Sequence, residues 1–183
     1  KNELIVLLHC DLDAAGCKLN IEHKMPGIRK KYFYTNYGDL KQRVQEIEDY
    51  VKQHGNSNCL MADVSWSTHP EQLHIMCNLF EKITLIDHHL YPEEFFENYP
   101  NLKVHWDKSK CATLLCYEYF KNDNQNLLKI SKLIDVYDIW QDEHKAFDIS
   151  QDLNRFFWHI GMEKFVTDCI NSEYSLPYYY KGI

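Results

Sequence analysis

The chain has 183 residues and a mass of 22.0 kDa, and 45% of its residues are hydrophobic, which is enough to build the core of one ordinary domain. Glycine and proline are sparse, at 6 and 5 residues, so collagen-like, low-complexity and linker-like classes are excluded. The formal net charge of −7 repels polyanions, so extensive binding to duplex nucleic acid is not expected unless cations or a basic patch reverse the charge.

The cysteines and the apolar runs bear on the compartment in which the chain works. Its 7 cysteines are scattered singly rather than paired at ligand or disulfide spacing, which predicts reduced thiols. The first apolar run is broken by His9 and Asp11, and no later window approaches the roughly 18 apolar residues of a membrane span. We therefore expect a cytoplasmic protein with neither an export signal nor a membrane span.

Alternating strands and helices run along the first two thirds of the chain. Apolar runs of strand length occupy residues 3–9, 30–35, 59–64, 83–89 and, more weakly, 103–106. Segments of helical spacing lie between them: residues 14–24, a helix capped by Asp39 that ends at Gly55, and a helix that begins at Pro70. From Cys111 onward the pattern is mainly helical.

This order of elements predicts an α/β fold with a mostly parallel sheet, helices on both faces of the sheet and a helical C-terminal third. We expect a single domain, with an α/β core over residues 1–125 and a helical extension over residues 126–183. Binding sites in such folds lie at the carboxyl ends of the strands.

Side chains that can ligate metal ions gather at those ends. Three of them alternate directly after the first strand, and the strand period of two places them on one side: His9, Asp11 and Asp13. The third strand ends in Asp63, and the fourth ends in an Asp-His-His triplet at residues 87–89. Asp135 and Asp138 come from the helical part. Together these residues predict a site at one edge of the sheet.

A metal ion explains this set better than helix capping does. Capping could account for Asp13 or Asp63 taken singly, but three or four carboxylates beside His9 and His88 would repel one another without divalent cations. Mixed histidine and carboxylate ligands suit Mn²⁺ or a similar ion. A calcium loop is excluded because Ala15 stands at its fifth position, and structural zinc is disfavoured because no cysteines are paired at ligand spacing.

The order of the motifs resembles the DHH phosphoesterase superfamily. HxDxD after the first strand, a lone aspartate after the third, Asp-His-His after the fourth and a later aspartate are similar to its four motifs and span residues 4 to about 140. The segment KSKCATLLCYEYF at residues 108–120 resembles the helix after the third motif of nuclease-like members. The superfamily includes RecJ-type exonucleases, nanoRNases, cyclic-dinucleotide phosphodiesterases and family II pyrophosphatases.

The resemblance implies two divalent cations, Mn²⁺ first, with Mg²⁺ or Co²⁺ as alternatives. It assigns one cation to His9 and Asp11, the other to Asp13, His88 and Asp138, and makes Asp63 the bridge between them. Such a pair, about 3.5–4 Å apart, would activate water for in-line attack on phosphorus. His89 would contact a phosphate oxygen or protonate the leaving group, and Asp87 would orient His88.

Two features depart from the family pattern. No second domain of the DHHA1 type, with its glycine-rich substrate motif, is recognised after Asp138. The fourth motif is ambiguous between Asp135 and Asp138. The resemblance to the Ala-Asp ending of the RecJ-type motif favours Asp138, with Asp135 as a cap or a supporting residue.

Several other residues are candidates for substrate contact. Lys108, Ser109 and Lys110 precede a predicted helix, whose amide groups are a natural phosphate site, although an ordinary solvated turn explains the lysines equally well. The basic run at residues 29–31 beside Tyr32 could follow a single strand, but an exposed charge run is the simpler explanation.

The tryptophans are interpreted mainly as packing residues. Trp66 and His69 follow Asp63, where a base could stack, although packing is the simpler interpretation of Trp66. Trp140 and the aromatic cluster at residues 156–158 fit helix packing better than base stacking. The three tyrosines at residues 178–180 fit a contact surface or a tail and indicate no chemistry.

The favoured function is a metal-dependent phosphodiesterase acting on short single-stranded oligonucleotides or on small cyclic or bisphosphate nucleotides. A pyrophosphatase-like phosphoanhydride hydrolase is the second hypothesis, and a non-catalytic nucleotide-binding or regulatory module is the third. The nuclease-like helix at residues 108–120 disfavours the second, and the complete motifs disfavour the third. Small nucleotides or short single strands are the expected partners, rather than duplex DNA or a membrane, and self-association into a homo-oligomer is left open.

Overall fold

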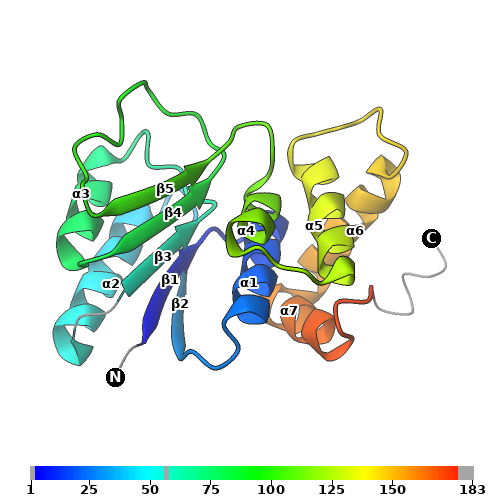
Figure 1. The fold of residues 1–183 in the computed structure, drawn as a ribbon, viewed down its shortest axis with the longest axis horizontal. Helices are drawn as coiled ribbons and strands as arrows, with labels where there is room; N and C mark the ends of the chain where they lie inside the picture. Colours follow the sequence, from blue (N-terminus) through cyan, green and yellow to red (C-terminus); the bar gives the residue numbers. More distant parts are fainter. Residues whose placement is uncertain (1–2, 56–57, 177–183) are drawn as a thin grey trace. The chain divides into compact units, whose positions relative to one another are not determined.

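The computed structural model describes residues 3–55 and 58–176, so the tyrosines at residues 178–180 lie outside the described residues. The chain folds into two compact units, whose course can be followed by colour in Figure 1. The first unit contains the chain up to His9 together with residues 27–108, and the second contains residues 10–26 and the chain from Ser109 onward.

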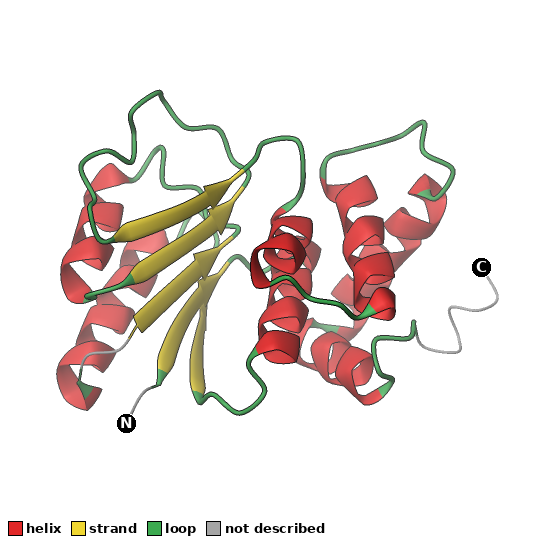
Figure 2. Cartoon of the chain, in the orientation of Figure 1, coloured by secondary structure: helices red, strands yellow, loops and turns green. Residues whose placement is uncertain are grey.

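The first unit is built on a parallel sheet. Its strands are β1 (Leu4–Leu8), β2 (Lys30–Tyr34), β3 (Asn58–Ala62), β4 (Ile83–Asp87) and β5 (Leu102–Trp106). Their order is β2-β1-β3-β4-β5, and every neighbouring pair is parallel (Figure 2). The register pairs Leu8 with both Tyr34 and Ala62, so three strands end level with one another. The predicted α/β fold with a parallel sheet is confirmed, and the strand ends share one edge.

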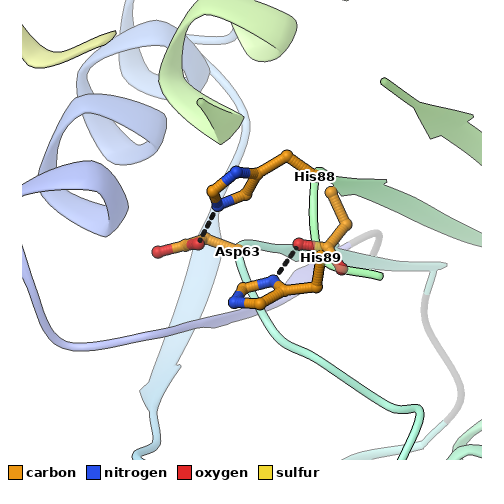
Figure 3. A group of neighbouring side chains, drawn as sticks. Asp63, His88 and His89 are labelled. Carbon is orange, nitrogen blue, oxygen red and sulfur yellow. Dashed lines mark hydrogen bonds and ion pairs between the residues drawn. The ribbon is translucent and has the colours of Figure 1, made fainter. Parts of the chain in front are cut away.

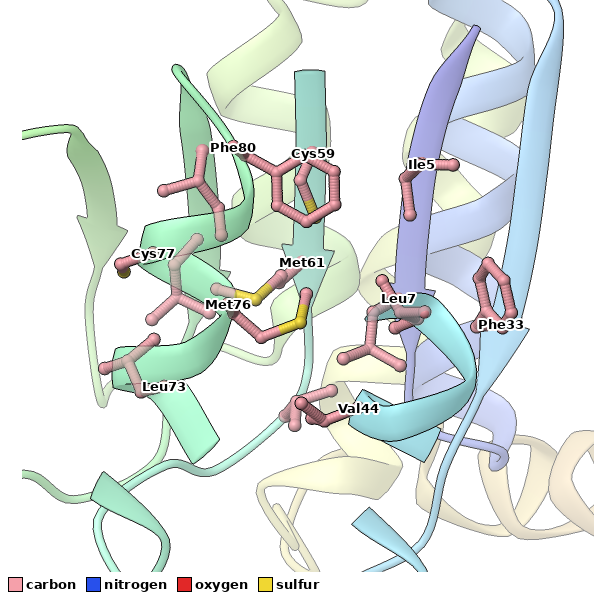
Figure 4. Packing of buried hydrophobic residues seen from close by; sticks show 14 of the residues in the cluster. Ile5, Leu7, Phe33, Val44, Cys59, Met61, Leu73, Met76, Cys77 and Phe80 are labelled. Carbon is pink, nitrogen blue, oxygen red and sulfur yellow. The ribbon is translucent and has the colours of Figure 1, made fainter. Parts of the chain in front are cut away.

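Two helices of this unit, α2 (Leu40–His54) and α3 (Pro70–Leu79), pack against one face of the sheet (Figure 4). The buried residues of α2 recur at helical spacing: Leu40, Val44, Ile47 and Val51. They share one hydrophobic core with alternate strand residues such as Leu7 and Met61. α3 carries Pro70 in its first turn, as predicted. This core holds the sheet whose carboxyl edge carries the candidate site.

Asp39 stands at the N-cap position of α2, but its carboxylate forms no hydrogen bond to the helix amides. Its Oδ1 accepts hydrogen bonds from the Asn36 amide and the Thr35 hydroxyl, each at 2.8 Å. The predicted capping contact is therefore wrong. An aspartate side chain can accept hydrogen bonds from the backbone of residues next to it in sequence. The Asp39 carboxylate therefore closes the turn that follows β2, and Tyr37 lies in that turn.

The described part of the second unit is helical. Its helices are α1 (Leu12–Lys24), α4 (Ala112–Phe120), α5 (Gln125–Asp138), α6 (Phe147–Ile160) and α7 (Met162–Asn171). They share a core in which Leu19, Ile134 and Phe157 are at most 1% exposed. This core explains why α1 and α4 belong to the same unit as the C-terminal helices, whereas the sequence placed both within an α/β core ending at residue 125.

The helices of the second unit approach one another closely at Gly16. A β-carbon built there would lie 2.0 Å from Thr113 Oγ1 and 2.7 Å from Ile134 Cδ1. One turn later, Asn20 donates hydrogen bonds to the Gly16 carbonyl at 3.0 Å and to the Ser131 hydroxyl at 3.2 Å. These contacts leave Thr113 of α4 and Ile134 of α5 little freedom to move. Only glycine therefore fits at this position of α1, where it faces α4 and α5.

Gly16→Ala is expected to lower the free energy of unfolding by about 3 kcal/mol, the upper end of the usual overpacking cost. Urea denaturation followed by circular dichroism measures the change. Gly27→Ala is the matched control, because a β-carbon at Gly27 meets nothing within 4 Å, and its stability should stay within about 0.5 kcal/mol of the parent. Equal stability of the two variants would contradict the close approach.

None of the helices among the described residues combines the length and the apolar character that a membrane crossing requires.

The 7 cysteines all lie within the described residues and carry free thiols, and all of them except Cys10 are buried.

Candidate metal centre

The carboxyl edge of the sheet carries five of the predicted site residues. His9 follows β1, Asp63 follows β3, Asp87 is the last residue of β4, and His88 and His89 come next. These three strands are adjacent in the sheet. The structure therefore brings together, within the first unit, side chains that are spread over 81 positions of the sequence, from residue 9 to residue 89 counted inclusively.

Asp63 is central to this group. Its backbone has a φ of 58°, in the left-handed region that aspartate and asparagine tolerate better than most residues, and its amide bonds to the Ile86 carbonyl at 3.1 Å. Its side chain is buried, and its Oδ1 lies 3.4 Å from His88 Nε2 (Figure 3). Its Oδ2 lies 3.8 Å from His9 Nδ1. The unusual backbone conformation marks a position of functional interest.

The 3.4 Å separation between Asp63 Oδ1 and His88 Nε2 suits a shared metal ion better than a direct hydrogen bond. Good N–H···O bonds are about 2.7–3.2 Å long, whereas two ligands of one ion, each bound at about 2.0–2.2 Å, lie roughly 3.0–3.5 Å apart. Asp63, Asp87, His88 and His89 each offer a ligand atom, and these atoms all lie within 4.8 Å of one another. The first unit thus holds acidic and imidazole groups that could bind a metal ion.

Asp87 is fully buried, and both of its oxygens are engaged. Oδ1 lies 2.7 Å from His89 Nδ1, and Oδ2 accepts a hydrogen bond from the Tyr91 hydroxyl. The expectation that Asp87 orients His88 is therefore corrected, because its contact is with His89. Burial and the neighbouring Asp87 carboxylate raise the pKa of the Tyr91 phenol, so Tyr91 remains a hydrogen-bond donor.

His89 is held on both ring nitrogens and on its backbone. Nδ1 faces Asp87, Nε2 lies 2.7 Å from the Tyr37 hydroxyl, and the carbonyl accepts a hydrogen bond from Trp106 Nε1 at 2.7 Å. Tyr37 also lies beside His9, with ring centroids 5.3 Å apart. These contacts fix the orientation of the His89 ring within the first unit.

Tyr37 and Tyr91 are site residues that the sequence interpretation missed. The signal for Tyr37 was its place in the turn directly after β2, because that strand ends at the same edge of the sheet. Tyr91 carries a weaker signal, since it only follows Asp87 by four positions in an irregular segment.

In the second unit, two predicted ligands act at helix N-termini. Asp11 caps α1 by accepting a hydrogen bond from the Ala14 amide at 3.0 Å. Asp13 is 1% exposed and accepts hydrogen bonds from the Ala112 and Thr113 amides at 2.8 and 2.7 Å. Asp13 thus holds the start of α4.

Asp135 and Asp138 both lie on α5, and Asp138 is its last residue. Both oxygens of Asp135 are engaged, by the Cys111 amide at 2.7 Å and by Gln141 Nε2 at 3.0 Å. Burial raises the pKa of the Cys111 thiol, and the charges of Asp13, Asp135 and Asp138 raise it further. Asp135 therefore holds the Cys111 amide at the start of α4, and the carboxylates of Asp13 and Asp138 also act on the Cys111 thiol there.

The predicted phosphate contacts lie just before α4. Lys108 is the last residue of the first unit. Ser109 and Lys110 are the first residues of the C-terminal segment of the second unit. Lys110 Nζ forms an ion pair with Glu118, with contacts of 2.8 and 3.0 Å. Carboxylates already accept hydrogen bonds from the amides at the start of α4. A phosphate would therefore have to be bound by the side chains of this turn rather than by the helix amides.

The basic run after α1 is partly neutralised within the first unit. Arg29 pairs with Glu3 at 2.8 Å, and Lys31 lies over the rings of Phe33 and Tyr50 at 5.5 and 5.4 Å. These contacts agree with the simpler interpretation of an exposed charge run.

The tryptophans divide in a way that the sequence did not foresee. Trp66 is fully buried, so its interpretation as a packing residue is confirmed and it offers no face to a base. Trp140 and Trp158 are 57% and 60% exposed, so the packing role predicted for them is wrong, whereas Phe157 between them in sequence is 1% exposed. Helix α6 turns Phe157 into the core and thereby turns Trp158 out of it.

Neither a protein-family model nor a curated protein matches the sequence of this chain. Solved structures do match it. An uncharacterized protein from Helicobacter pylori G27 aligns with a TM-score of 0.68 and 21% identity over 85% of this chain and 48% of that protein. CDC45 from Entamoeba histolytica aligns with a TM-score of 0.59 and 11% identity over 87% of this chain and 34% of that protein.

RecJ from Thermus thermophilus, solved in complex with Mn²⁺, aligns with a TM-score of 0.51 and 12% identity over 74% of this chain and 21% of that protein. The chain spans less than half the length of each of these three structures. At such identities the similarity concerns the fold. The fold of the chain is thus similar to the folds of RecJ and CDC45, and a RecJ-like fold is what the resemblance of its motifs implied.

Proposed function

We propose that this chain is a DHH-type phosphoesterase that uses divalent cations, Mn²⁺ above all, to hydrolyse phosphodiester bonds in short single-stranded oligonucleotides or small nucleotides. The placement of Asp63 carries the proposal: its two oxygens lie 3.4 Å from His88 and 3.8 Å from His9, at the edge where α/β folds bind ligands. The RecJ-like fold and the four motifs in order support it.

The donor set fits a divalent cation, because histidine nitrogens and aspartate oxygens converge at a buried strand edge. In the first unit His9, Asp63 and His88 would be the ligands. The resemblance assigns the remaining ligand positions to residues of the second unit, Asp11, Asp13 and Asp138. When bound, the cations would supply an activated water and stabilise the charge of an in-line phosphoryl transition state.

The remaining residues would position the substrate. Asp87 fixes the ring of His89 through Nδ1, so that Nε2 is presented at the Tyr37 hydroxyl, where a phosphate oxygen could join or replace that contact. Lys108, Ser109 and Lys110 are the proposed further phosphate contacts, and the Lys110 ion pair with Glu118 would open to admit the substrate.

A hydrolysis panel tests the proposed function. The purified chain is incubated with Mn²⁺, with Mg²⁺ or with EDTA, and with the dinucleotide pApA, short RNA, short DNA, 3′-phosphoadenosine 5′-phosphate or pyrophosphate. Mn²⁺-dependent release of mononucleotides is the expected result. Turnover of pyrophosphate alone would indicate a phosphoanhydride hydrolase, and binding of nucleotides without turnover would indicate a regulatory module.

Mn²⁺ is expected to raise the melting temperature of the EDTA-treated protein. At a concentration 100 times its Kd, a single bound ligand stabilises the folded state by about 2.7 kcal/mol, or roughly 5–10 °C for a chain of this size. Differential scanning fluorimetry measures the shift. Asp63→Asn should shrink it, whereas Asp49→Asn, an exposed residue of α2, should leave it unchanged. A melting temperature indifferent to both Mn²⁺ and EDTA would refute the metal site.

A further inference from the structure

The row of side chains at the candidate metal centre continues onto β5. In the register of the sheet, Asp87 is paired with Trp106, the last residue of β5. The residue before Asp87 lies level with the last residues of β1 and β3, so His9 and Asp63 follow at the level of this pair. Trp106 is therefore the fourth member of a row that crosses four adjacent strands, all within the first unit (Figure 1).

Trp106 projects from the same face of the sheet as Asp87. Alternate residues of a strand point to one face. Leu85, two positions before Asp87, lies in the core beneath α2 and α3, and Leu102, four positions before Trp106, packs against that same core. The Asp87 and Trp106 side chains are thus neighbours on one face, at the edge of the sheet where α/β folds bind ligands.

The indole ring of Trp106 is oriented by a direct contact with the site. Its Nε1 donates a hydrogen bond to the His89 carbonyl at 2.7 Å, and the Asp107 amide donates to the Asp87 carbonyl at 3.4 Å, which holds the backbone after the ring. The hydrogen bond engages the edge of the indole, and Trp106 is still 42% exposed. The site therefore carries an accessible aromatic surface in a fixed orientation.

Exposed apolar side chains of the first unit gather at this edge. Among its described residues, the exposed large hydrophobic side chains are those of Ile28, Tyr37, Leu90 and Trp106, and only Ile28 lies at the opposite end of the strands. Tyr37 contacts the ring of His89, whereas Trp106 contacts its carbonyl. Aromatic surface beside cation ligands matches a nucleotide, which has flat apolar base faces and a phosphate that binds cations.

We propose that Trp106 is the base-stacking platform of the substrate site, on which a nucleobase lies while its phosphate is held at the cations. This inference deepens the proposed function and rests on it. It also supplies what the sequence had sought in Trp66, whose full burial excludes stacking. Since any base offers a face to the ring, the platform favours nucleotides over pyrophosphate without choosing among bases.

Two substitutions separate stacking from the hydrogen bond to His89. Trp106→Gln removes the ring but keeps an N–H donor the same number of bonds from the backbone, whereas Trp106→Phe keeps an aromatic face and loses the donor. Isothermal titration with adenosine 5′-monophosphate and Mn²⁺ should show a Kd raised by about 5–150-fold in Trp106→Gln and by much less in Trp106→Phe. The reverse order would show that Trp106 only holds His89 and would overturn the platform.

Two further measurements test the role of the base. Ribose 5-phosphate, which has no base, should bind Trp106→Gln as it binds the parent. Adenosine 5′-monophosphate should quench the tryptophan fluorescence of the parent, and Trp106→Phe should lose this quenching while its melting temperature shows that it is folded. Trp158→Gln is the matched control, because Trp158 is 60% exposed in the second unit, and it should keep both the affinity and the quenching.

The platform and the proposed function can fail separately. Failure of the parent to bind adenosine 5′-monophosphate, unchanged affinity in Trp106→Gln, or an equal loss for ribose 5-phosphate would overturn the platform. If no substrate is hydrolysed yet binding still depends on Trp106, only the proposed function fails. If hydrolysis occurs and the affinity of Trp106→Gln is unchanged, only the platform fails.

Discussion

Asp63→Asn is expected to lower kcat/KM for the best nucleotide substrate by about 10³-fold, the largest effect of any single substitution at the edge of the sheet. Asp63 faces both His88 and His9, at 3.4 and 3.8 Å, so losing its charge weakens every ligand group gathered around it. Asp87→Asn is expected to cost only about 10–100-fold, because Asp87 contacts His89 and Tyr91 and acts by orienting the histidine.

The backbone conformation at Asp63 allows the effect of Asp63→Asn on activity to be separated from an effect on folding. Asparagine adopts a φ near 58° as readily as aspartate does, so the substitution removes charge and leaves the turn after β3 in place. Steady-state kinetics at saturating Mn²⁺, with melting curves for each variant, make the measurement. Asp49→Asn on the exposed face of α2 should retain full activity. Equal losses at Asp63 and Asp87, or the reverse order, would remove Asp63 from the centre of the site.

Substrate length is expected to have the second large effect. With a net charge of −7 and the basic residues Arg29 and Lys31 engaged within the first unit, the chain offers few phosphate contacts besides the proposed cations. We therefore expect kcat/KM to be highest for two to a few nucleotides and to fall more than tenfold by about 20 nucleotides, beyond the ~4–16 nucleotides of a typical single-strand site.

The measurement is kcat/KM for a series of single strands from two to about 20 nucleotides, at low and at high salt. Short substrates should depend weakly on salt because they make few phosphate contacts. Native duplex DNA of the same length is the control and should be a poor substrate at any salt. Efficiency that rises with length and falls steeply with salt would instead reveal an extended basic channel.

The sequence by itself determined the sheet and the edge that carries the site. The run Leu4–Leu8 is apolar at every position, which is the local pattern of a strand buried on both faces, and helices of ordinary length separate such runs. Parallel strands place their carboxyl ends at one edge, so His9, Asp63 and His88 could be grouped without coordinates. The period of the apolar residues and the alternation of strands with helices are sufficient for that inference.

Only the tertiary structure decided which side chain each of these residues contacts. Asp87 bonds to His89 rather than orienting His88, Tyr37 reaches His89 across 52 positions, and Asp13 reaches Thr113 across 100. Local periodicity indicates the face from which a side chain projects, but it carries no information about what a distant segment places opposite that face.

The tryptophans show most plainly that local sequence does not determine which distant segments pack against a side chain. Trp66 and Trp140 follow a candidate site aspartate by three and two positions, yet Trp66 is fully buried and Trp140 is 57% exposed. Trp66 joins the core between the sheet, α2 and α3, while Trp140 stands on a turn that Gln141 fastens to Asp135. Burial of a large apolar ring is decided by which elements pack over it, and that packing is a property of the whole folded unit rather than of the ring's neighbours in sequence.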